Sequence, residues 1–293
     1  MSDVAETFRS YLEKGESVGS RYALDVPRNV PSGLAGSRLG QRAGSSLEFK
    51  DFRDYQPGDD LRRIDWSAYA RSDQLIVRLY REEVQPHLDL VLDVSRSMDL
   101  PDSKKLEATL GLAGAFTSAA TSTGYTHNAW TAGQSCDPIT GGNDRPAAWT
   151  GLSFDGRSTP SEALSKGPPQ WHPRGIRILI SDLLWMDEPM RTLENLAYGA
   201  AAVYVVQVLA KADVNPPERG NLRLVDHETG EIKEVFVDAA AEERYRNLLA
   251  QHQENWDQAA RQVGAVLTTV VAEPLVEHWD LSELVRARVL TVA

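Results

Sequence analysis

The order of apolar and polar residues changes character near residue 87. From there onward, short apolar runs alternate with longer segments in which apolar residues recur every three or four positions. The short runs predict buried strands, and the longer segments predict amphipathic helices. The strands are expected at HLDLVLDV (87–94), YTHNAWTA (125–132), IRILISDLL (176–184), AVYVVQVL (202–209) and AVLTTVV (265–271). Strands that alternate with helices in this way are typical of a largely parallel sheet covered by helices on both faces.

The segments between these strands complete the α/β pattern. Helical spacing is found over residues 106–120, 188–199, 245–263 and 276–290. A further helix is predicted over residues 1–20, and a hairpin over residues 222–237 that turns near Thr229 and Gly230. We therefore expect one α/β domain over residues 85–293, preceded by an N-terminal extension with short strands over residues 1–84.

Composition limits the classes of partner. The chain has 42 acidic and 31 basic residues, which gives a net charge of −11. Nucleic acids and anionic membranes bind basic surfaces, so we expect neither as a partner. A single cysteine, Cys136, excludes an intramolecular disulfide and a cysteine-cluster metal site. The sequence starts without an apolar core of signal-peptide length and has no window near the ~20 apolar residues of a membrane span, so we expect a cytoplasmic protein.

The residues most suggestive of chemistry follow the first predicted strand. The run LDLVLDVSRSM (88–98) places Asp93 at the end of the strand and Ser95 and Ser97 in the loop after it. Alternate positions of an extended turn point to a common side, so one carboxylate and two hydroxyls can face one point. Thr159 at a loop-to-helix junction and Asp182 at the end of another strand are placed where a shared site at the strand ends would need them.

An oxygen-only set of this kind suits a hard divalent cation. Mg²⁺ is favoured, with Mn²⁺ or Ca²⁺ as alternatives, because it prefers octahedral oxygen coordination and usually keeps some water. In the competing interpretation, Ser97 or Asp99 merely caps the next helix. Thr159 and Asp182 favour metal binding over capping, although Ser158 is an alternative to Thr159 as the ligand from the second loop.

Asp93, Ser95 and Ser97 form an Asp-x-Ser-x-Ser loop, which resembles the metal-ion-dependent adhesion site (MIDAS) of von Willebrand factor A-like domains. The resemblance implies a Rossmann-like α/β fold and a ligand set completed by a threonine and an aspartate from two further loops. Thr159 and Asp182 occupy the corresponding places, although the third loop lacks the glycine of the common Thr-Asp-Gly. The resemblance also implies that the cation accepts an acidic side chain from a protein partner.

A longer motif lies upstream, in EFKDFRDYQPGDDLRRIDWSAYAR (48–71). Its Arg-x-Tyr-x-Pro-Gly-Asp-Asp core and its Ile-Asp-Trp are similar to the bacterial family catalogued as domain of unknown function 58. The resemblance implies work with MoxR-type AAA+ ATPases in maturing or remodelling other proteins. From the residues alone, the segment is either an ion-pair layer under an aromatic lid or a docking surface.

We therefore expect a Mg²⁺-dependent protein-binding module without catalysis, acting as an adaptor between a MoxR-type AAA+ ATPase and an unknown client. One alternative is a metal-dependent hydrolase of phosphoesters, with Asp93 and a cation activating water or Ser95 as nucleophile. The sequence lacks G-x-S-x-G, H-E-x-x-H and Walker motifs, which disfavours this alternative. Another alternative is a metal-free scaffold protein.

Overall fold

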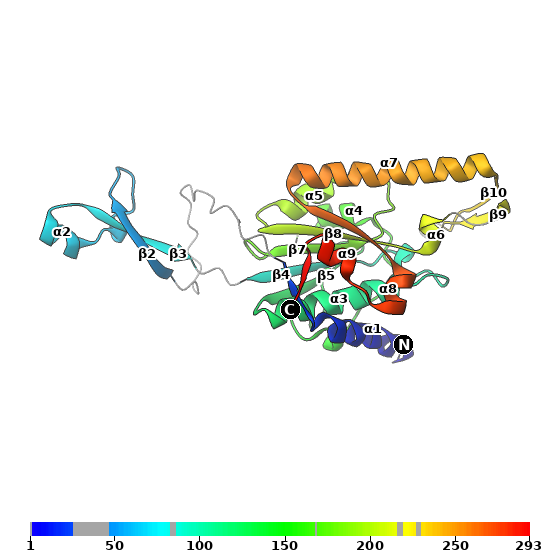
Figure 1. Cartoon of the computed structure of the whole chain (residues 1–293), viewed down its shortest axis with the longest axis horizontal. Helices are drawn as coiled ribbons and strands as arrows, with labels where there is room; N and C mark the ends of the chain where they lie inside the picture. Colours follow the sequence, from blue (N-terminus) through cyan, green and yellow to red (C-terminus); the bar gives the residue numbers. More distant parts are fainter. Residues whose placement is uncertain (1, 26–46, 83–85, 168, 216–218, 227–229) are drawn as a thin grey trace. The chain divides into compact units, whose positions relative to one another are not determined.

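The computed structural model describes residues 2–25, 47–82, 86–167, 169–215, 219–226 and 230–293 (Figure 1). Contacts between residues divide the chain into two units. The larger unit comprises residues 1–30 and 86–293, and the smaller unit comprises residues 31–85. Among the helices of the described residues, none combines the length and the apolar character that a membrane span requires.

The larger unit is built on a six-stranded sheet in the order β11-β8-β7-β4-β5-β6. Its strands are β4 (His87–Asp93), β5 (Thr126–Ala132), β6 (Cys136–Pro138), β7 (Ile176–Ser181), β8 (Ala202–Leu209) and β11 (Val266–Val271). Neighbouring strands are parallel except β5 and β6, which pair antiparallel. The predicted α/β class with a mostly parallel sheet is confirmed, and only β6 was not expected from the apolar runs.

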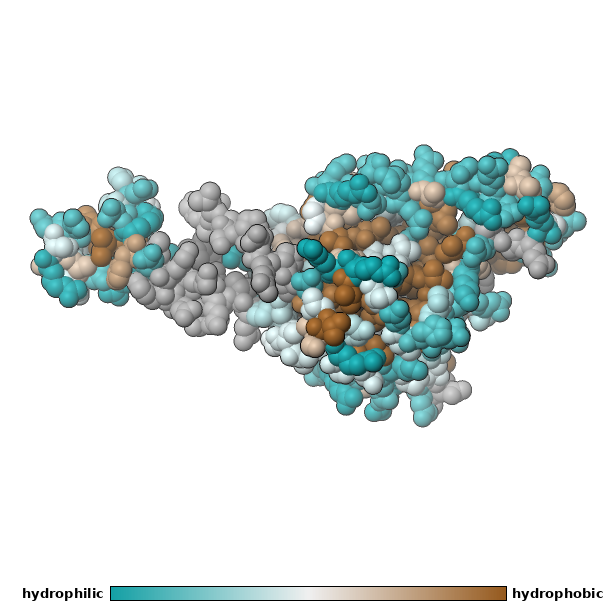
Figure 2. Space-filling model, in the orientation of Figure 1, coloured by the Kyte–Doolittle hydropathy of each residue, from teal (hydrophilic) through white to brown (hydrophobic). Residues whose placement is uncertain are grey.

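Helices cover both faces of this sheet (Figure 1). One face is covered by α3 (Lys105–Ser122), α8 (Ala272–His278) and α9 (Ser282–Arg286), and α1 (Ser2–Gly19) packs on α3. The other face is covered by α4 (Pro160–Lys166), α5 (Pro189–Ala197) and α7 (Ala239–Val263). Figure 2 shows hydrophilic residues along the outer side of α7 and hydrophobic residues beneath it, as an amphipathic helix requires.

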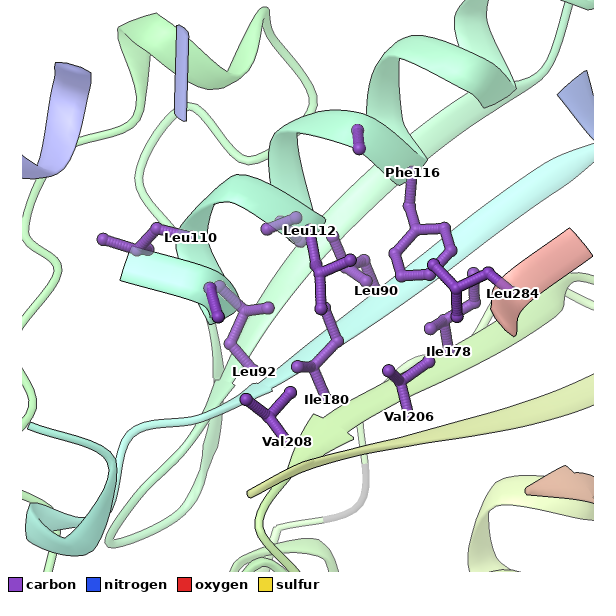
Figure 3. Close-up of a cluster of buried hydrophobic side chains, with 14 of the residues drawn as sticks. Leu90, Leu92, Leu110, Leu112, Phe116, Ile178, Ile180, Val206, Val208 and Leu284 are labelled. Atoms are coloured by element: carbon purple, nitrogen blue, oxygen red, sulfur yellow. The ribbon is translucent and has the colours of Figure 1, made fainter. Parts of the chain in front are cut away.

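Each central strand contributes to two cores, because alternate residues point to opposite faces of the sheet. Leu90 and Ile178 pack with Phe116 of α3 on one face (Figure 3). Val91 packs on the other face in the cluster that contains Trp256 of α7. These side chains are 2 % exposed or less, so truncating one to alanine is expected to cost about 2–5 kcal/mol.

The N-terminal helix α1 belongs to the larger unit because it packs against α3. Phe8 and Leu12 are buried in the core that the two helices share. The backbones approach so closely that a Cβ on Gly15 would collide with the backbone of Gly111. Strand β1 (Tyr22–Leu24) then pairs with β12 (Leu290–Val292) near the other end of the chain. The sequence analysis placed all of residues 1–84 in an N-terminal extension, whereas the larger unit includes residues 1–30.

The predicted hairpin is present as β9 (Gly220–Val225) and β10 (Ile232–Val237), which pair antiparallel. Its predicted turn at Thr229 falls outside the described residues. Helix α7 begins earlier than the apolar spacing predicts, because the side chain of Asp238 accepts a hydrogen bond from the Ala241 N–H and caps it. Gly264 ends α7 in the left-handed conformation, with φ of 72°. The short helix α6 (Lys211–Val214) follows β8, and the 3₁₀ turns η2 (Arg96–Met98) and η3 (Pro146–Ala148) follow β4 and β6.

The smaller unit contains the antiparallel pair β2 (Leu47–Asp54) and β3 (Ile76–Glu82), with the turn η1 (Leu61–Arg63) and helix α2 (Trp66–Ser72) between them. Asp65 caps α2 by accepting hydrogen bonds from two backbone N–H groups at 3.0 Å each. Its other oxygen accepts from the Arg78 guanidinium at 3.0 and 3.1 Å. The motif thus contains an ion pair, but Trp66 is 59 % exposed and does not form the predicted aromatic lid over it.

Candidate functional site

A cavity of about 530 Å³ lies at the carboxyl ends of β4 and β7. Four predicted site residues line it, namely Ser95, Ser97, Thr159 and Asp182. They come from the loop after β4, the start of α4 and the loop after β7. Parallel strands bring their carboxyl ends to one edge, which explains why segments so distant along the chain converge there. The structure thus brings together the oxygens of three separate loops.

Asp93, the fifth predicted residue, lies behind the cavity rather than in its lining. Its side chain is fully buried, and Oδ1 accepts a hydrogen bond from the Ser95 backbone N–H at 2.9 Å. Oδ2 accepts from the Ser181 hydroxyl at 2.6 Å. Burial, and next the charge of Asp182, raise the pKa of Asp93 to about 7. Asp93 therefore ties the first loop to the end of β7 and sets the path of the backbone that presents Ser95.

The first and second loops are joined directly. A parallel β-bridge pairs Ser95 with Gly156, and the Gly156 N–H donates to the Val94 carbonyl at 3.0 Å. A Cβ at Gly156 would lie 2.9 Å from that carbonyl oxygen, so the approach depends on glycine. The bridge is what brings the start of α4 to the cavity. Within the first loop, the hydroxyl oxygens of Ser95 and Ser97 lie 3.0 Å apart.

Thr159 is both a helix cap and a cavity residue. Its hydroxyl accepts a hydrogen bond from the Glu162 N–H at 3.2 Å and donates one to Asp187 at 2.5 Å. The alternative residue, Ser158, also lines the cavity, and its hydroxyl accepts from the Lys166 ammonium at 3.0 Å. A cation already bonds to the Ser158 oxygen, so Thr159 is the better placed of the two to offer an oxygen to another cation.

Asp182 has a partner that the sequence analysis did not identify. Its Oδ1 accepts from the Leu184 N–H at 3.0 Å, and its Oδ2 lies 2.9 Å from the ammonium of Lys105. Lys105 is 1 % exposed and also lies 3.4 Å from a carboxylate oxygen of Asp213. Burial opposes the charged form of Lys105, but Asp182 and Asp213 outweigh this effect and raise its pKa above the usual value.

Two sequence signals point to these missed residues. Lys105 is the first residue of α3, where a positive charge is opposed by the helix dipole and needs compensation from elsewhere. Asp213 lies in the short helix α6, which follows β8, the strand next to β7, so it is at the same edge of the sheet. The rule that places ligands at the ends of parallel strands therefore applies to Asp213 as well.

The hydroxyl and carboxylate oxygens that line the cavity are ligands of the kind that a hard divalent cation prefers. Neighbouring ligands of an octahedral ion bound at about 2.1 Å are about 3.0 Å apart, which is the separation of the Ser95 and Ser97 oxygens. Within the described ranges, no group of three or more His, Cys, Asp and Glu side chains is placed to hold a metal. Hydroxyl groups would therefore have to contribute. Basic side chains at this site oppose a second cation: Lys105 pairs with Asp182, the Lys166 ammonium bonds to Ser158, and Arg157 is part of the lining.

The sequence profile of the family described as "Protein of unknown function DUF58" matches residues 51–255. Uncharacterized proteins of Mycobacterium bovis and Mycobacterium tuberculosis are each 28 % identical over 279 residues, which covers 90 % of this chain and 85 % of theirs. An uncharacterized protein of Mycobacterium avium is 31 % identical over 117 residues, which covers 39 % of this chain and 67 % of its own.

Two solved structures show distant likeness to the chain. One is described as the conserved hypothetical protein BatB from Bacteroides thetaiotaomicron, with a TM-score of 0.35, 10 % identity, and 69 % of this chain and 98 % of that one covered. The other is an aerotolerance-related membrane protein from Bacteroides fragilis, with a TM-score of 0.32, 14 % identity, and 61 % and 98 % covered.

Proposed function

The chain belongs to the DUF58 family, and we propose that its larger unit is a non-catalytic protein-binding module. In this proposal the cavity takes an acidic side chain of a partner protein with the help of a divalent cation, Mg²⁺ in the first place. The observation that carries the proposal is the convergence of Ser95, Ser97, Thr159 and Asp182 on one cavity. These residue types and this order of loops are what the adhesion-site resemblance implies, except that Asp93 lies behind the cavity.

Each residue has a distinct task in this proposal. The hydroxyls of Ser95, Ser97 and Thr159 and the carboxylate of Asp182 are the groups that hold the cation. Asp93 positions the first loop through the Ser95 N–H and the Ser181 hydroxyl. When bound, Mg²⁺ would supply positive charge and a coordination position for a carboxylate of the partner.

The hydrogen bonds of the site support binding over hydrolysis. The Ser95 hydroxyl pairs with the Ser97 hydroxyl, and both oxygens of Asp93 already accept hydrogen bonds from other groups. A catalytic serine requires a base within reach of its proton, and here Asp93 does not face the cavity. The alternative of a phosphoester hydrolase therefore receives less support than binding.

A metal-free scaffold is the second candidate, and one observation favours it. The Lys105 ammonium already compensates Asp182, so the cavity has a cation of its own. In that case a partner carboxylate would be met by hydroxyl groups and by Lys105 without Mg²⁺. The two candidates differ in one measurable property, which is the dependence of partner binding on divalent cations.

Calorimetric titration of the full chain with Mg²⁺, and in parallel with Mn²⁺ and Ca²⁺, tests the proposal. The Ser95→Ala/Ser97→Ala variant should bind Mg²⁺ at least about tenfold more weakly than the wild type. Ser165→Ala is the matched control, because this hydroxyl bonds to the Ser161 carbonyl in α4 and does not line the cavity. Equal Mg²⁺ affinity of the double variant and the wild type would show that these hydroxyls are not ligands of the cation.

The identity of the partner is a separate part of the proposal. The family resemblance suggests a MoxR-type AAA+ ATPase, with the chain as an adaptor between it and a client that offers an acidic side chain. Recovery of the ATPase or of the client by the immobilised chain should fall when a chelator is added. Recovery that is the same with and without chelator would favour the metal-free scaffold.

A further inference from the structure

The ammonium group of Lys105 is a cation that belongs to the chain itself and lines the cavity. Its ammonium lies 2.9 Å from Asp182 Oδ2 and 3.4 Å from Asp213 Oδ2. Lysine is almost never fully buried unless it is paired, and this side chain is 1 % exposed at the start of a helix, where the dipole also opposes it. The two carboxylates are therefore what hold the ammonium in place.

We propose that Lys105 is a tethered competitor of the divalent cation, so that the ammonium and the divalent ion use Asp182 alternately. The hydrogen bonds of Asp182 support this competition. Oδ1 already accepts from the Leu184 N–H, and Oδ2 is the oxygen that Lys105 holds. A divalent ion that binds Asp182 in the cavity takes the remaining acceptor site of Oδ1 or shares Oδ2 with the ammonium. In both cases two positive charges lie at short range on one carboxylate and repel each other.

Asp213 is the residue that can keep the displaced ammonium inside the protein. Its Oδ2 is fixed by a hydrogen bond from the Ala210 N–H at 2.8 Å. The Asp213 carbonyl is also held, by the Tyr245 hydroxyl at 2.6 Å. A small shift of the Lys105 side chain from one carboxylate to the other would free Asp182 without exposing or unpairing the charge. We therefore assign Asp213 the task of holding Lys105 while Asp182 binds the divalent ion.

This competition gives the site a property that a simple metal site lacks. A partner carboxylate adds negative charge to the cavity, and a doubly charged ion compensates that charge better than an ammonium does. The divalent ion is therefore expected to bind measurably to the wild type alone and more tightly when the partner is present. The inference deepens the proposed function and rests on it in treating the cavity as a cation site.

Mg²⁺ titration of four forms of the full chain tests the competition: wild type, Lys105→Met, Asp213→Asn and the double variant. The double variant removes one positive and one negative charge, so it lacks the ammonium but keeps the net charge of the wild type. We expect it to bind Mg²⁺ at least about tenfold more tightly than the wild type, equivalent to about 1.4 kcal/mol. Asp213→Asn alone should bind more weakly than the wild type, because the ammonium then has only Asp182.

Equal Mg²⁺ affinity of the wild type and the double variant would overturn the competition and leave the proposed function standing. Binding by the double variant and none by the wild type would support the competition and contradict Mg²⁺ dependence in the native protein. No binding by either form would overturn both. Circular dichroism checks that each variant is folded, and if the double variant is not, Asp213→Asn carries the test, with unchanged or tighter binding as the contradicting result.

Discussion

Strand β4 carries two fully buried carboxylates, Asp89 and Asp93, on the same face of the sheet. Asp89 lies toward the amino end of the strand, and Asp93 is its last residue. Buried carboxylates are costly unless they are paired or hydrogen-bonded, so both must have partners. The two groups of partners differ, and the difference separates a structural carboxylate from one that organises a site.

Asp89 is surrounded by groups that belong to the core. It accepts hydrogen bonds from the Trp130 indole at 3.2 Å and from the His172 backbone N–H at 3.1 Å, and the His87 ring lies 3.5 Å away. Burial lowers the pKa of Arg177 to about 10, against the opposing effect of the Asp89 charge. These contacts join neighbouring strands and loops, and Asp89 has no part in the lining of the cavity.

Asp93 is bonded instead to loops that line a cavity. Its partners are the Ser95 N–H and the Ser181 hydroxyl, and the negative charge of Asp182 acts on it. The comparison teaches that burial alone does not distinguish the two carboxylates. The end of the parallel sheet at which each lies decides whether its partners come from packed elements or from converging loops.

The largest effect on stability is expected from Asp89→Ala. This change leaves the Trp130 indole and the His172 N–H without their acceptor and removes a favourable negative charge near the buried Arg177. The free energy of unfolding should therefore fall by about 3 kcal/mol. Urea denaturation measures the change, with the exposed Asp102→Ala as a control expected within about 0.5 kcal/mol of the wild type. Mg²⁺ affinity of the folded variant should stay at the wild-type value. A loss of affinity would show that Asp89 also contributes to the cation site.

Asp93→Asn should have the opposite profile. The amide can still accept the hydrogen bond from Ser95 and no longer repels Asp182, so the free energy of unfolding should change by less than about 1 kcal/mol. Mg²⁺ affinity measured above the pKa of Asp93, which is about 7, should fall at least about tenfold, because the negative charge behind the first loop is lost. Denaturation and calorimetry on the same preparation check both results. A large loss of stability with unchanged Mg²⁺ affinity would make Asp93 a structural residue like Asp89.

The last prediction concerns the second loop. Thr159→Ala removes the cap of α4 and should lower the free energy of unfolding by about 1 kcal/mol. It should also weaken Mg²⁺ binding, whereas Thr159→Ser should preserve both properties. Ser158→Ala is the matched comparison and should leave Mg²⁺ affinity unchanged. If Ser158→Ala weakens binding and Thr159→Ala does not, the ligand assignment must be exchanged.

Most of the sheet could be predicted from the sequence because its central strands are rich in apolar residues, whereas the short polar strand β6 was missed. Convergence of the first, second and third loops on one cavity followed from the rule for parallel strands, and Ser95, Thr159 and Asp182 are indeed cavity residues. The place of α1 was missed, because its packing depends on close approach of Gly15 to Gly111 of a distant helix. Periodicity reports which face of a helix is apolar but not which element covers that face.

The ion pair of Lys105 with Asp182 was missed for a similar reason. The two residues are 77 positions apart, and no local pattern links a lysine at a helix start to the end of a particular strand. Its discovery changes the interpretation of the site, because a cavity with its own ammonium differs from one with hydroxyls and carboxylates alone. Charged residues at unfavourable helix positions are therefore a useful signal for buried partners.

The most direct test of the account is an anomalous diffraction measurement on crystals of the wild-type chain soaked in saturating Mn²⁺. The account predicts one anomalous peak within coordination distance of the Ser95 and Ser97 hydroxyls and Asp182, with the Lys105 ammonium moved onto Asp213. A cavity without a peak, in which Lys105 still pairs with Asp182, would contradict it.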